Sequence, residues 1–268
     1  MRSLMLGKAL PKMLVSCLVL LAACGCAQPP PPASSPHPVA LTKSSGSTLA
    51  GTTIVLDPGH NGASAAHPAE INRQVPTGRG GTKACNTTGT STNSGYPEHA
   101  FTWDVAVRVR DALTAHGIRV VLTRPNDTGV GPCVDERAAT ANRAGAAGVI
   151  SIHADGAAPS GRGFHVAYSD PPLNSSQGAP SIGLANALVT SLRGGHFLTS
   201  NYMGSNGLNP RSDLAGLNLA KIPAVLVECA NMRNAHEAGL VSTPAGRARY
   251  ATAITQGIMA WLASRSRR

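Results

Sequence analysis

The chain has 268 residues, a formal net charge of +10 and only 3% aromatic residues. A basic chain suits an anionic partner, but the basic residues are scattered and are not interleaved with aromatic ones, which argues against a nucleic-acid-binding protein. The basic tail, residues 265–268, is therefore expected to be a solvated end.

Residues 1–23 have the features of a secretory signal peptide, because a basic start precedes an apolar run that is too short to span a bilayer as a mature helix. The end of this run, Leu-Ala-Ala followed by Cys24, resembles the lipobox of bacterial lipoproteins, in which the cysteine is lipidated and becomes the first mature residue. The alternative is ordinary cleavage near Ala27. We expect an exported protein of the cell envelope, either a membrane-anchored lipoprotein or a secreted or periplasmic protein.

Residues 24–50 are rich in proline, serine and alanine and are expected to form an extended linker that buries no core. The remaining globular part, residues 51–264, is long enough for one domain with a substantial core. We expect this single domain to carry the catalytic function.

Short apolar runs and helix-period segments alternate along this domain, which predicts an α/β fold with a mostly parallel or mixed central sheet flanked by helices. The order of the strands does not follow from the pattern. Two segments without periodicity, residues 61–97 and 201–220, are expected to be long loops that wall the site. The expected strands are residues 54–56, 118–123, 148–152, 164–168 and 223–227, and the expected helices are residues 98–116, 135–147, 181–192 and 245–263.

Three of the expected strands end on side chains that suit a metal site: His60, His153 and Glu228. In open α/β sheets, ligands and chemistry lie at the carboxyl ends of the strands. Two histidines and a glutamate brought there by separate strands would suit a zinc hydrolase.

Three cysteines lie in the predicted domain. Cys85 and Cys133 both occur in loops rich in Gly, Thr or Pro, and export would place them in an oxidising compartment. We predict a disulfide between these two and a buried thiol for Cys229, which follows an apolar strand. Three free thiols or a different pairing remain alternatives.

Four motifs in order resemble the zinc-dependent N-acetylmuramoyl-L-alanine amidases: Asp-Pro-Gly-His at residues 57–60, a helix-opening Glu98, Ser-Ile-His-Ala at 151–154 and Val-Leu-Val-Glu at 225–228. The resemblance extends over essentially the whole domain. The cysteine-bearing loop and residues 228–232 look closest to the actinobacterial branch.

The resemblance implies that His60, Glu98 and His153 bind Zn²⁺ and that Glu228 is the catalytic carboxylate. Catalytic zinc takes three protein ligands and leaves one position open for water, which agrees with this set. Glu70 and His99 are rivals for the third ligand, because an acidic residue at a helix start, such as Glu98, is also expected from the helix dipole. Two further residues, Arg211 and Asn218, lie on the loop before the last strand and are candidates for substrate contact.

The resemblance therefore predicts hydrolysis of the amide between N-acetylmuramic acid and L-alanine in peptidoglycan, for cell-wall remodelling or cell separation. The expected partners are peptidoglycan and muropeptides, with no nucleic acid and with a possible membrane tether through a lipidated Cys24. The protein is expected to be a monomer. The alternatives are another zinc peptidase that acts within the stem peptide, and a wall-binding lipoprotein without catalytic activity.

Overall fold

The computed structural model describes residues 49–266. The predicted signal peptide, Cys24 and nearly all of the predicted linker lie outside the described residues, and so do the last two residues of the basic tail. Within residues 49–266, no helix combines the length and the apolar character that a membrane span requires.

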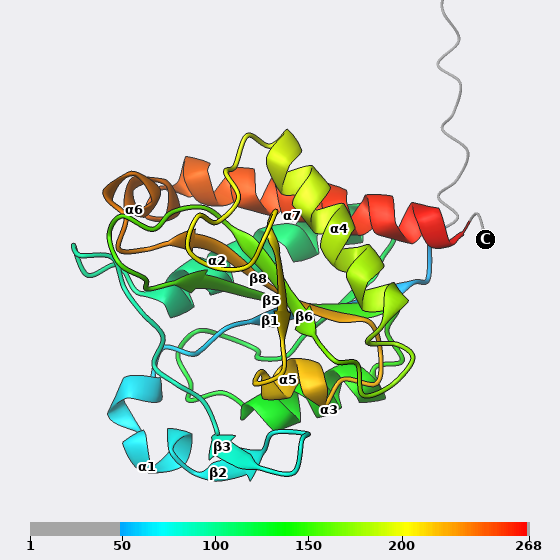
Figure 1. The fold of residues 1–268 in the computed structure, drawn as a ribbon, viewed down its shortest axis with the longest axis horizontal. Helices are drawn as coiled ribbons and strands as arrows, with labels where there is room; N and C mark the ends of the chain where they lie inside the picture. The colour runs from blue at the N-terminus through cyan, green and yellow to red at the C-terminus, as the bar shows by residue number, and fades with distance from the viewer. Residues whose placement is uncertain (1–48, 267–268) are drawn as a thin grey trace, which may run out of the picture. The chain divides into compact units, whose positions relative to one another are not determined.

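A six-stranded mixed sheet forms the centre of the domain (Figure 1). Four neighbouring strands are parallel, whereas β6 runs antiparallel to β8 and β7 runs parallel to β6. This arrangement confirms the predicted single α/β domain with a mixed sheet. In spatial order the strands are β4 (Arg119–Leu122), β1 (Thr53–Pro58), β5 (Gly148–Asp155), β8 (Ala224–Asn231), β6 (His165–Ser169) and β7 (Leu208–Arg211).

The strand register brings the predicted chemistry to one edge of the sheet. Pro58, near the end of β1, pairs with Ile152 of β5, and the next residue of β5, His153, pairs with Glu228 of β8. Because neighbouring parallel strands lie about 4.8 Å apart, residues at equal height on β1, β5 and β8 fall within reach of a single ligand.

Helices cover both faces of this sheet (Figure 1). On one face lie α2 (Glu98–Ala115), α4 (Ala179–Gly194) and α7 (Pro244–Arg265), and the short α6 (Ala235–Val241) packs on α7. On the other face lie α3 (Val134–Arg143) and α5 (Ala215–Asn218). Each helical face therefore excludes water from one side of the strands that carry the site.

The two cores differ in the size of their side chains. Under α2, the residues at helical spacing, Phe101, Val105, Val109 and Leu113, are fully buried. Under α3 and α5 the core is built largely from alanines, with Val55, Val149 and Leu217. Small side chains between the sheet and these two helices leave space on that face, and the cleft described below uses it.

The predicted elements differ from the structure at several boundaries and in the two segments predicted to be loops. Helix α3 ends at Arg143 rather than Ala147. The two segments expected to be loops contain short elements of three or four residues, which are too short to show a period in the sequence. These elements are the 3-10 helix η1 (Ser64–Ala66), α1 (Pro68–Ile71), β2 (Gln74–Pro76) and β3 (Thr82–Ala84) in the first segment, and β7 and α5 in the second.

A disulfide joins Cys85 to Cys133 and confirms the predicted pairing. Cys133 is the residue immediately before α3, so the bridge fastens the segment after β3 to the start of that helix. Cys229 is a buried free thiol, as predicted.

Candidate active site

His60, Glu98 and His153 converge at the carboxyl edge of the sheet. Glu98 lies between the two histidines: its Oε2 is 3.1 Å from His60 Nε2, and its Oε1 is 3.0 Å from His153 Nδ1. The three candidate ligand atoms lie within 4.8 Å of one another, which is close enough to hold one metal ion. The three predicted ligands are thus brought together.

The two rival ligands point elsewhere. His99 Nδ1 lies 2.8 Å from Asp127 Oδ2, and Glu70 pairs with His67 on the exposed helix α1. Neither side chain contributes to the cluster around Glu98.

The orientation of His60 is fixed by its own backbone and by a neighbouring carbonyl. His60 has a φ of 59°, in the left-handed region that residues other than glycine adopt only at some cost. This conformation ends β1 abruptly and turns the imidazole toward Glu98. Nδ1 lies 2.9 Å from the carbonyl oxygen of Thr87, so Nδ1–H donates there and Nε2 is left to face Glu98.

Gly59 provides the space for the second histidine. A Cβ at this position would lie 2.2 Å from Cε1 of His153. Only glycine therefore allows the His153 imidazole to lie against the turn that carries His60. The rings of the two histidines meet edge to face with centroids 4.9 Å apart.

Glu98 is buried, and both oxygens of its carboxylate accept hydrogen bonds from the backbone. Oε2 accepts from the backbone N–H of Thr90 at 2.9 Å, and Oε1 accepts from the backbone N–H of Ala154 at 3.1 Å. Burial would raise the pKa of Glu98, but the adjacent imidazoles of His60 and His153 outweigh it and hold that pKa well below its usual value. The group is therefore an anion, which suits a cation held between the histidines.

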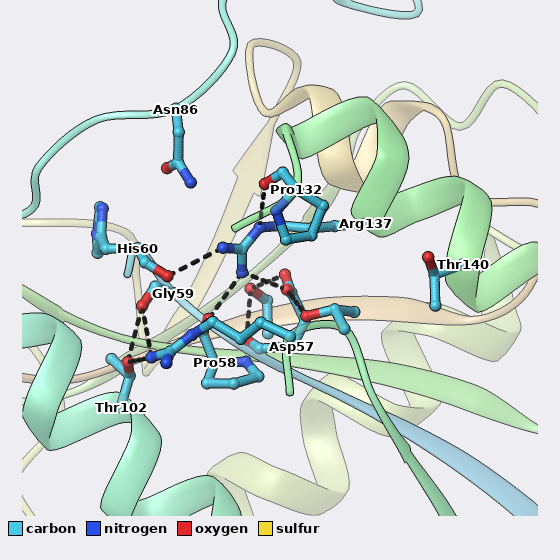
Figure 2. Close-up of polar contacts among 12 residues, drawn as sticks. Asp57, Pro58, Gly59, His60, Asn86, Thr102, Pro132, Arg137 and Thr140 are labelled. Carbon is cyan, nitrogen blue, oxygen red and sulfur yellow. Dashed lines mark hydrogen bonds and ion pairs between the residues drawn. The ribbon is translucent and has the colours of Figure 1, made fainter. Parts of the chain in front are cut away.

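A buried ion pair supports the turn that carries His60 (Figure 2). Arg137, from α3, donates to Asp57 Oδ1 at 2.8 Å and to the backbone carbonyls of Pro58 at 2.7 Å and His60 at 2.9 Å. Its Nε donates to the carbonyl of Pro132 at 2.9 Å. Burial alone would raise the pKa of Asp57, but Arg137 and hydrogen bonds from Thr123 and Ser151 lower it to about 2.

Glu228 extends from β8 into the same site, next to His153 in the sheet register. Its Oε2 is buried and has no hydrogen-bond partner among the described residues. Burial raises the pKa of Glu228 well above its usual value, and the nearby carboxylates of Asp155 and Glu98 raise it further, while Arg211 opposes them. A carboxyl group with a raised pKa holds a proton more readily than an ordinary glutamate, which suits a group that must take up and return a proton.

A second carboxylate, Asp155, is held beside Glu228 by two donors that the sequence did not single out. Tyr202 donates its hydroxyl to Asp155 Oδ2 at 2.9 Å, and His165 Nε2 lies 2.9 Å from the same oxygen. The other ring nitrogen of His165 faces the side-chain amide nitrogen of Asn209 at 3.3 Å, which favours a proton on Nε2. Asp155 is thus fixed at the rim of the site.

These groups open onto a cleft of about 320 Å³. Its lining includes His60, Glu98, His153 and Glu228. It also includes apolar side chains from and near α3, α5 and the sheet, namely Val134, Ala138, Leu214, Leu217, Val149 and Leu226. A cleft that combines convergent polar groups with apolar walls is typical of a substrate site.

A model of the N-acetylmuramoyl-L-alanine amidase family matches residues 54–260, which is most of the chain and all of the site. The chain belongs to this family. The amidase is 52% identical to "N-acetylmuramoyl-L-alanine amidase Rv3717" of Mycobacterium tuberculosis over 216 residues, which cover 81% of this chain and 88% of that protein. The prediction of an N-acetylmuramoyl-L-alanine amidase, and of its actinobacterial branch, is confirmed.

Solved structures of mycobacterial amidases have the same fold as this amidase. The N-acetylmuramyl-L-alanine amidase Ami1 from Mycobacterium smegmatis is 55% identical, with a TM-score of 0.79 over 81% of this chain and 100% of that one. The apo form of Ami1 from Mycobacterium abscessus is 50% identical, with a TM-score of 0.78 over 80% of this chain and 100% of that one. AmiC2 of Nostoc punctiforme, at 23% identity and a TM-score of 0.60, shares the fold.

The two residues of the amidase that were expected to contact substrate lie outside the lining of the cleft. Asn218 is buried, and its side chain accepts from Arg79 and Ser169 and donates to the carbonyls of Thr77 and Ser212. Arg211 pairs with Asp213 through two contacts of 2.6 and 2.7 Å. Their contacts favour structural roles, and substrate contact by either stays a prediction.

Asn86 of the amidase lines the cleft and was not singled out in the sequence. It directly follows Cys85, in a segment without periodicity, so no pattern separates it from its polar neighbours. The available signal was its position beside a cysteine that pairs, since a bridged residue holds its neighbours in place.

Proposed function

We propose that this amidase is a zinc enzyme that hydrolyses the amide between the lactyl group of N-acetylmuramic acid and L-alanine of the stem peptide. The observation that carries this proposal is the convergence of His60, Glu98 and His153 at the end of a cleft that also holds Glu228. The family match supports the scissile bond, and the ligand set supports the metal.

The residues fit a catalytic zinc ion in three respects. Two imidazoles and one carboxylate are ligands that zinc accepts, and three protein ligands leave a position for water. His60 donates its second ring N–H to the carbonyl of Thr87, the kind of contact that orients metal-bound histidines. Glu98 supplies a buried negative charge that no lysine or arginine in contact with it neutralises among the described residues.

When bound, the zinc ion would polarise the amide carbonyl and make a water molecule more acidic. Glu228 would accept one proton from that water while the oxygen of the water bonds to the carbonyl carbon. As the bond between carbon and nitrogen breaks, Glu228 would return the proton to the leaving nitrogen. The products are a lactyl carboxylic acid and a free amine on L-alanine, with no covalent enzyme intermediate.

Glu98 and Arg137 would position the site rather than exchange protons. Glu98 is already bonded through both oxygens, and Arg137 holds the backbone of the turn that ends in His60. This division leaves Glu228 as the carboxylate of the cluster with an unpartnered oxygen.

The cellular role that we propose is cell-wall remodelling or cell separation. Export would rest on the predicted signal peptide, and a lipidated Cys24 would tether the protein to the membrane. A single acyl chain gives only marginal membrane binding, so a stable anchor would need more than one chain. We propose a monomer, with peptidoglycan and its muropeptide fragments as substrates.

A paired assay tests the proposal. Zinc-loaded protein, with its metal content measured, and the Glu228→Ala variant are incubated with muramyl dipeptide and with longer muropeptides. Release of the L-alanyl peptide by the wild-type protein alone, with zinc retained in the variant, is the expected result. Cleavage inside the stem peptide would indicate another zinc peptidase, and binding without cleavage by the zinc-loaded wild-type protein would indicate a wall-binding protein.

A further inference from the structure

Asn86 presents an unpartnered donor at the wall of the cleft. The residue is only 8% exposed. Oδ1 accepts from the backbone N–H of Thr87 at 2.8 Å, whereas Nδ2 has no hydrogen-bond partner among the residues that the structure describes. A buried amide nitrogen without a partner is costly, and native proteins rarely leave one except where a ligand or a water completes it.

The position of Asn86 is fixed on both sides. The preceding residue, Cys85, is bridged to Cys133, and the Asn86 backbone N–H donates to the carbonyl of Ile71 at 3.1 Å. The carbonyl of the following residue, Thr87, receives the Nδ1–H of His60. The segment that carries Asn86 is therefore tied to the turn that carries a proposed metal ligand.

Figure 2 shows the Asn86 amide directed from its loop toward His60 and Arg137, with no dashed contact to either. Arg137 is largely committed at this point, because four of its five N–H groups already donate to protein oxygens. Asn86 thus supplies an uncommitted donor on this wall of the cleft.

The rest of the cleft on this side indicates which part of the substrate passes Asn86. The same cleft is lined by apolar side chains of α3, Val134 and Ala138, and by Leu214 and Leu217 at α5. A sugar carries several hydroxyls that would each need a partner, and apolar walls offer none. A short peptide with small side chains needs partners only for its backbone, and Asn86 can serve one carbonyl.

We propose that Asn86 positions the substrate by donating Nδ2–H to the carbonyl oxygen of L-alanine, the first peptide carbonyl beyond the scissile bond. This inference rests on the proposed function and adds a specificity contact to it. Glu228 Oε2 is also unpartnered, and Glu228 lines the same cleft. The donor and the acceptor together match a peptide, whose backbone offers both a carbonyl and an N–H.

The variant Asn86→Asp tests this contact closely, because it keeps Oδ1 as the acceptor for Thr87 and replaces the Nδ2 donor by a charged acceptor of nearly the same shape. With zinc-loaded protein and muramyl dipeptide, we expect KM to rise about tenfold with little change in kcat, since a contact made equally in the ground and transition states is lost. Asn72→Asp adds the same charge on an exposed part of the same segment and should leave KM unchanged.

A substrate change identifies the carbonyl. Replacing the L-alanine carbonyl oxygen by sulfur gives a thioamide, a weaker acceptor with the same shape. The wild-type enzyme should have a kcat/KM several-fold lower for the thioamide than for the ordinary substrate. The Asn86→Asp variant should have the same kcat/KM for both substrates. Equal KM values for wild type and Asn86→Asp would overturn the proposal, and so would an equal thioamide penalty in both proteins.

A binding measurement separates this inference from the proposed function. Calorimetric titration of muramyl dipeptide into zinc-loaded Glu228→Ala, with and without Asn86→Asp, needs no turnover. About tenfold weaker binding in the double variant supports the contact. This result would stand even if the wild-type protein fails to hydrolyse the substrate, because that failure counts against the proposed function alone. Equal binding in both backgrounds would overturn the role of Asn86.

Discussion

Arg137 Nη1 lies 2.8 Å from Asp57 Oδ1. The same guanidinium donates to the carbonyls of Pro58 and His60, so one side chain from α3 holds both ends of the turn that delivers His60. The left-handed backbone of His60 is maintained by these contacts rather than by the residue's own preference. The position of a proposed zinc ligand therefore depends on a residue that is not itself one of the three proposed ligands.

Arg137→Lys should destabilise the protein by about 2 kcal/mol and weaken zinc binding, because a single ammonium cannot replace donors that reach Asp57, Pro132, Pro58 and His60 together. Urea unfolding and zinc competition with a chelator measure the two effects. Arg110→Lys, in an exposed pair with Asp111, is the matched control and should be nearly neutral. Unchanged zinc affinity in Arg137→Lys would show that the turn keeps its conformation without the contacts of Arg137.

Asp57 makes the stability of the domain depend on acidity. Its pKa in the folded protein is about 2, against an ordinary value of 3.8, so its stabilising effect is present above about pH 4 and is lost as the pH falls toward 2. The difference corresponds to about 2 kcal/mol. Unfolding of metal-free protein should show this loss between about pH 4 and pH 2, and Asp57→Asn should lack it. Parallel curves for the two proteins would contradict the assignment.

His153→Ala should bind far less than one zinc ion per chain and should lose amidase activity. Chelation should likewise inactivate the wild-type protein and lower its melting temperature, since a ligand present at 100 times its Kd stabilises by about 2.7 kcal/mol. Metal analysis and thermal unfolding with and without zinc give the readouts. His116→Ala, on the exposed end of α2, should keep both metal and activity. A full zinc ion in His153→Ala would remove His153 from the ligand set.

Gly59→Ala should reduce zinc affinity at least about tenfold, because its Cβ would lie 2.2 Å from the His153 ring and would displace it. The Gly59 backbone does not have a positive φ, so the expected effect is steric and local. Gly239→Ala in α6 has no atom within 4 Å of its Cβ and should stabilise the protein by up to about 1 kcal/mol. Normal zinc binding by Gly59→Ala would show that the histidine has room to move.

Removing the disulfide with Cys85→Ser and Cys133→Ser should destabilise the domain by up to about 4 kcal/mol, the entropic value for a sequence separation of 48 residues. KM should also rise, because the bridge fixes the segment that carries Asn86 and Thr87. Denaturant unfolding and steady-state kinetics measure these effects, and reduction of the wild-type protein provides an independent comparison. If stability and KM both stay unchanged, the disulfide neither stabilises the domain nor fixes the segment that lines the cleft.

The residues at strand ends could be predicted from the sequence because each follows a short apolar run, and the chemistry of α/β sheets concentrates at such ends. His60, His153 and Glu228 were found in this way. Glu98 needed the family resemblance, since an acidic residue at a helix start has an ordinary electrostatic explanation. The strand order required the structure, because parallel pairing joins segments that are far apart in the chain.

Other parts of the site left no local pattern. Asn86 and the contact of Asp155 with His165 and Tyr202 depend on partners from separate loops and strands, and each is an ordinary polar residue in the sequence. Elements of three or four residues, such as α1 and β3, are too short to show a period. The full burial of Arg124 could not be predicted from the sequence, since arginine is usually exposed.

The shared register of β1, β5 and β8 restricts how this enzyme can change over generations. Side chains alternate between the two faces of a strand, so an insertion or deletion of one residue in β5 before His153, or in β8 before Glu228, would turn that side chain to the opposite face. The same change in β1 would shift the register that places the turn carrying His60. Length variation among descendants of this gene should therefore accumulate in the segments around α1 and β7 and be absent from these three strands.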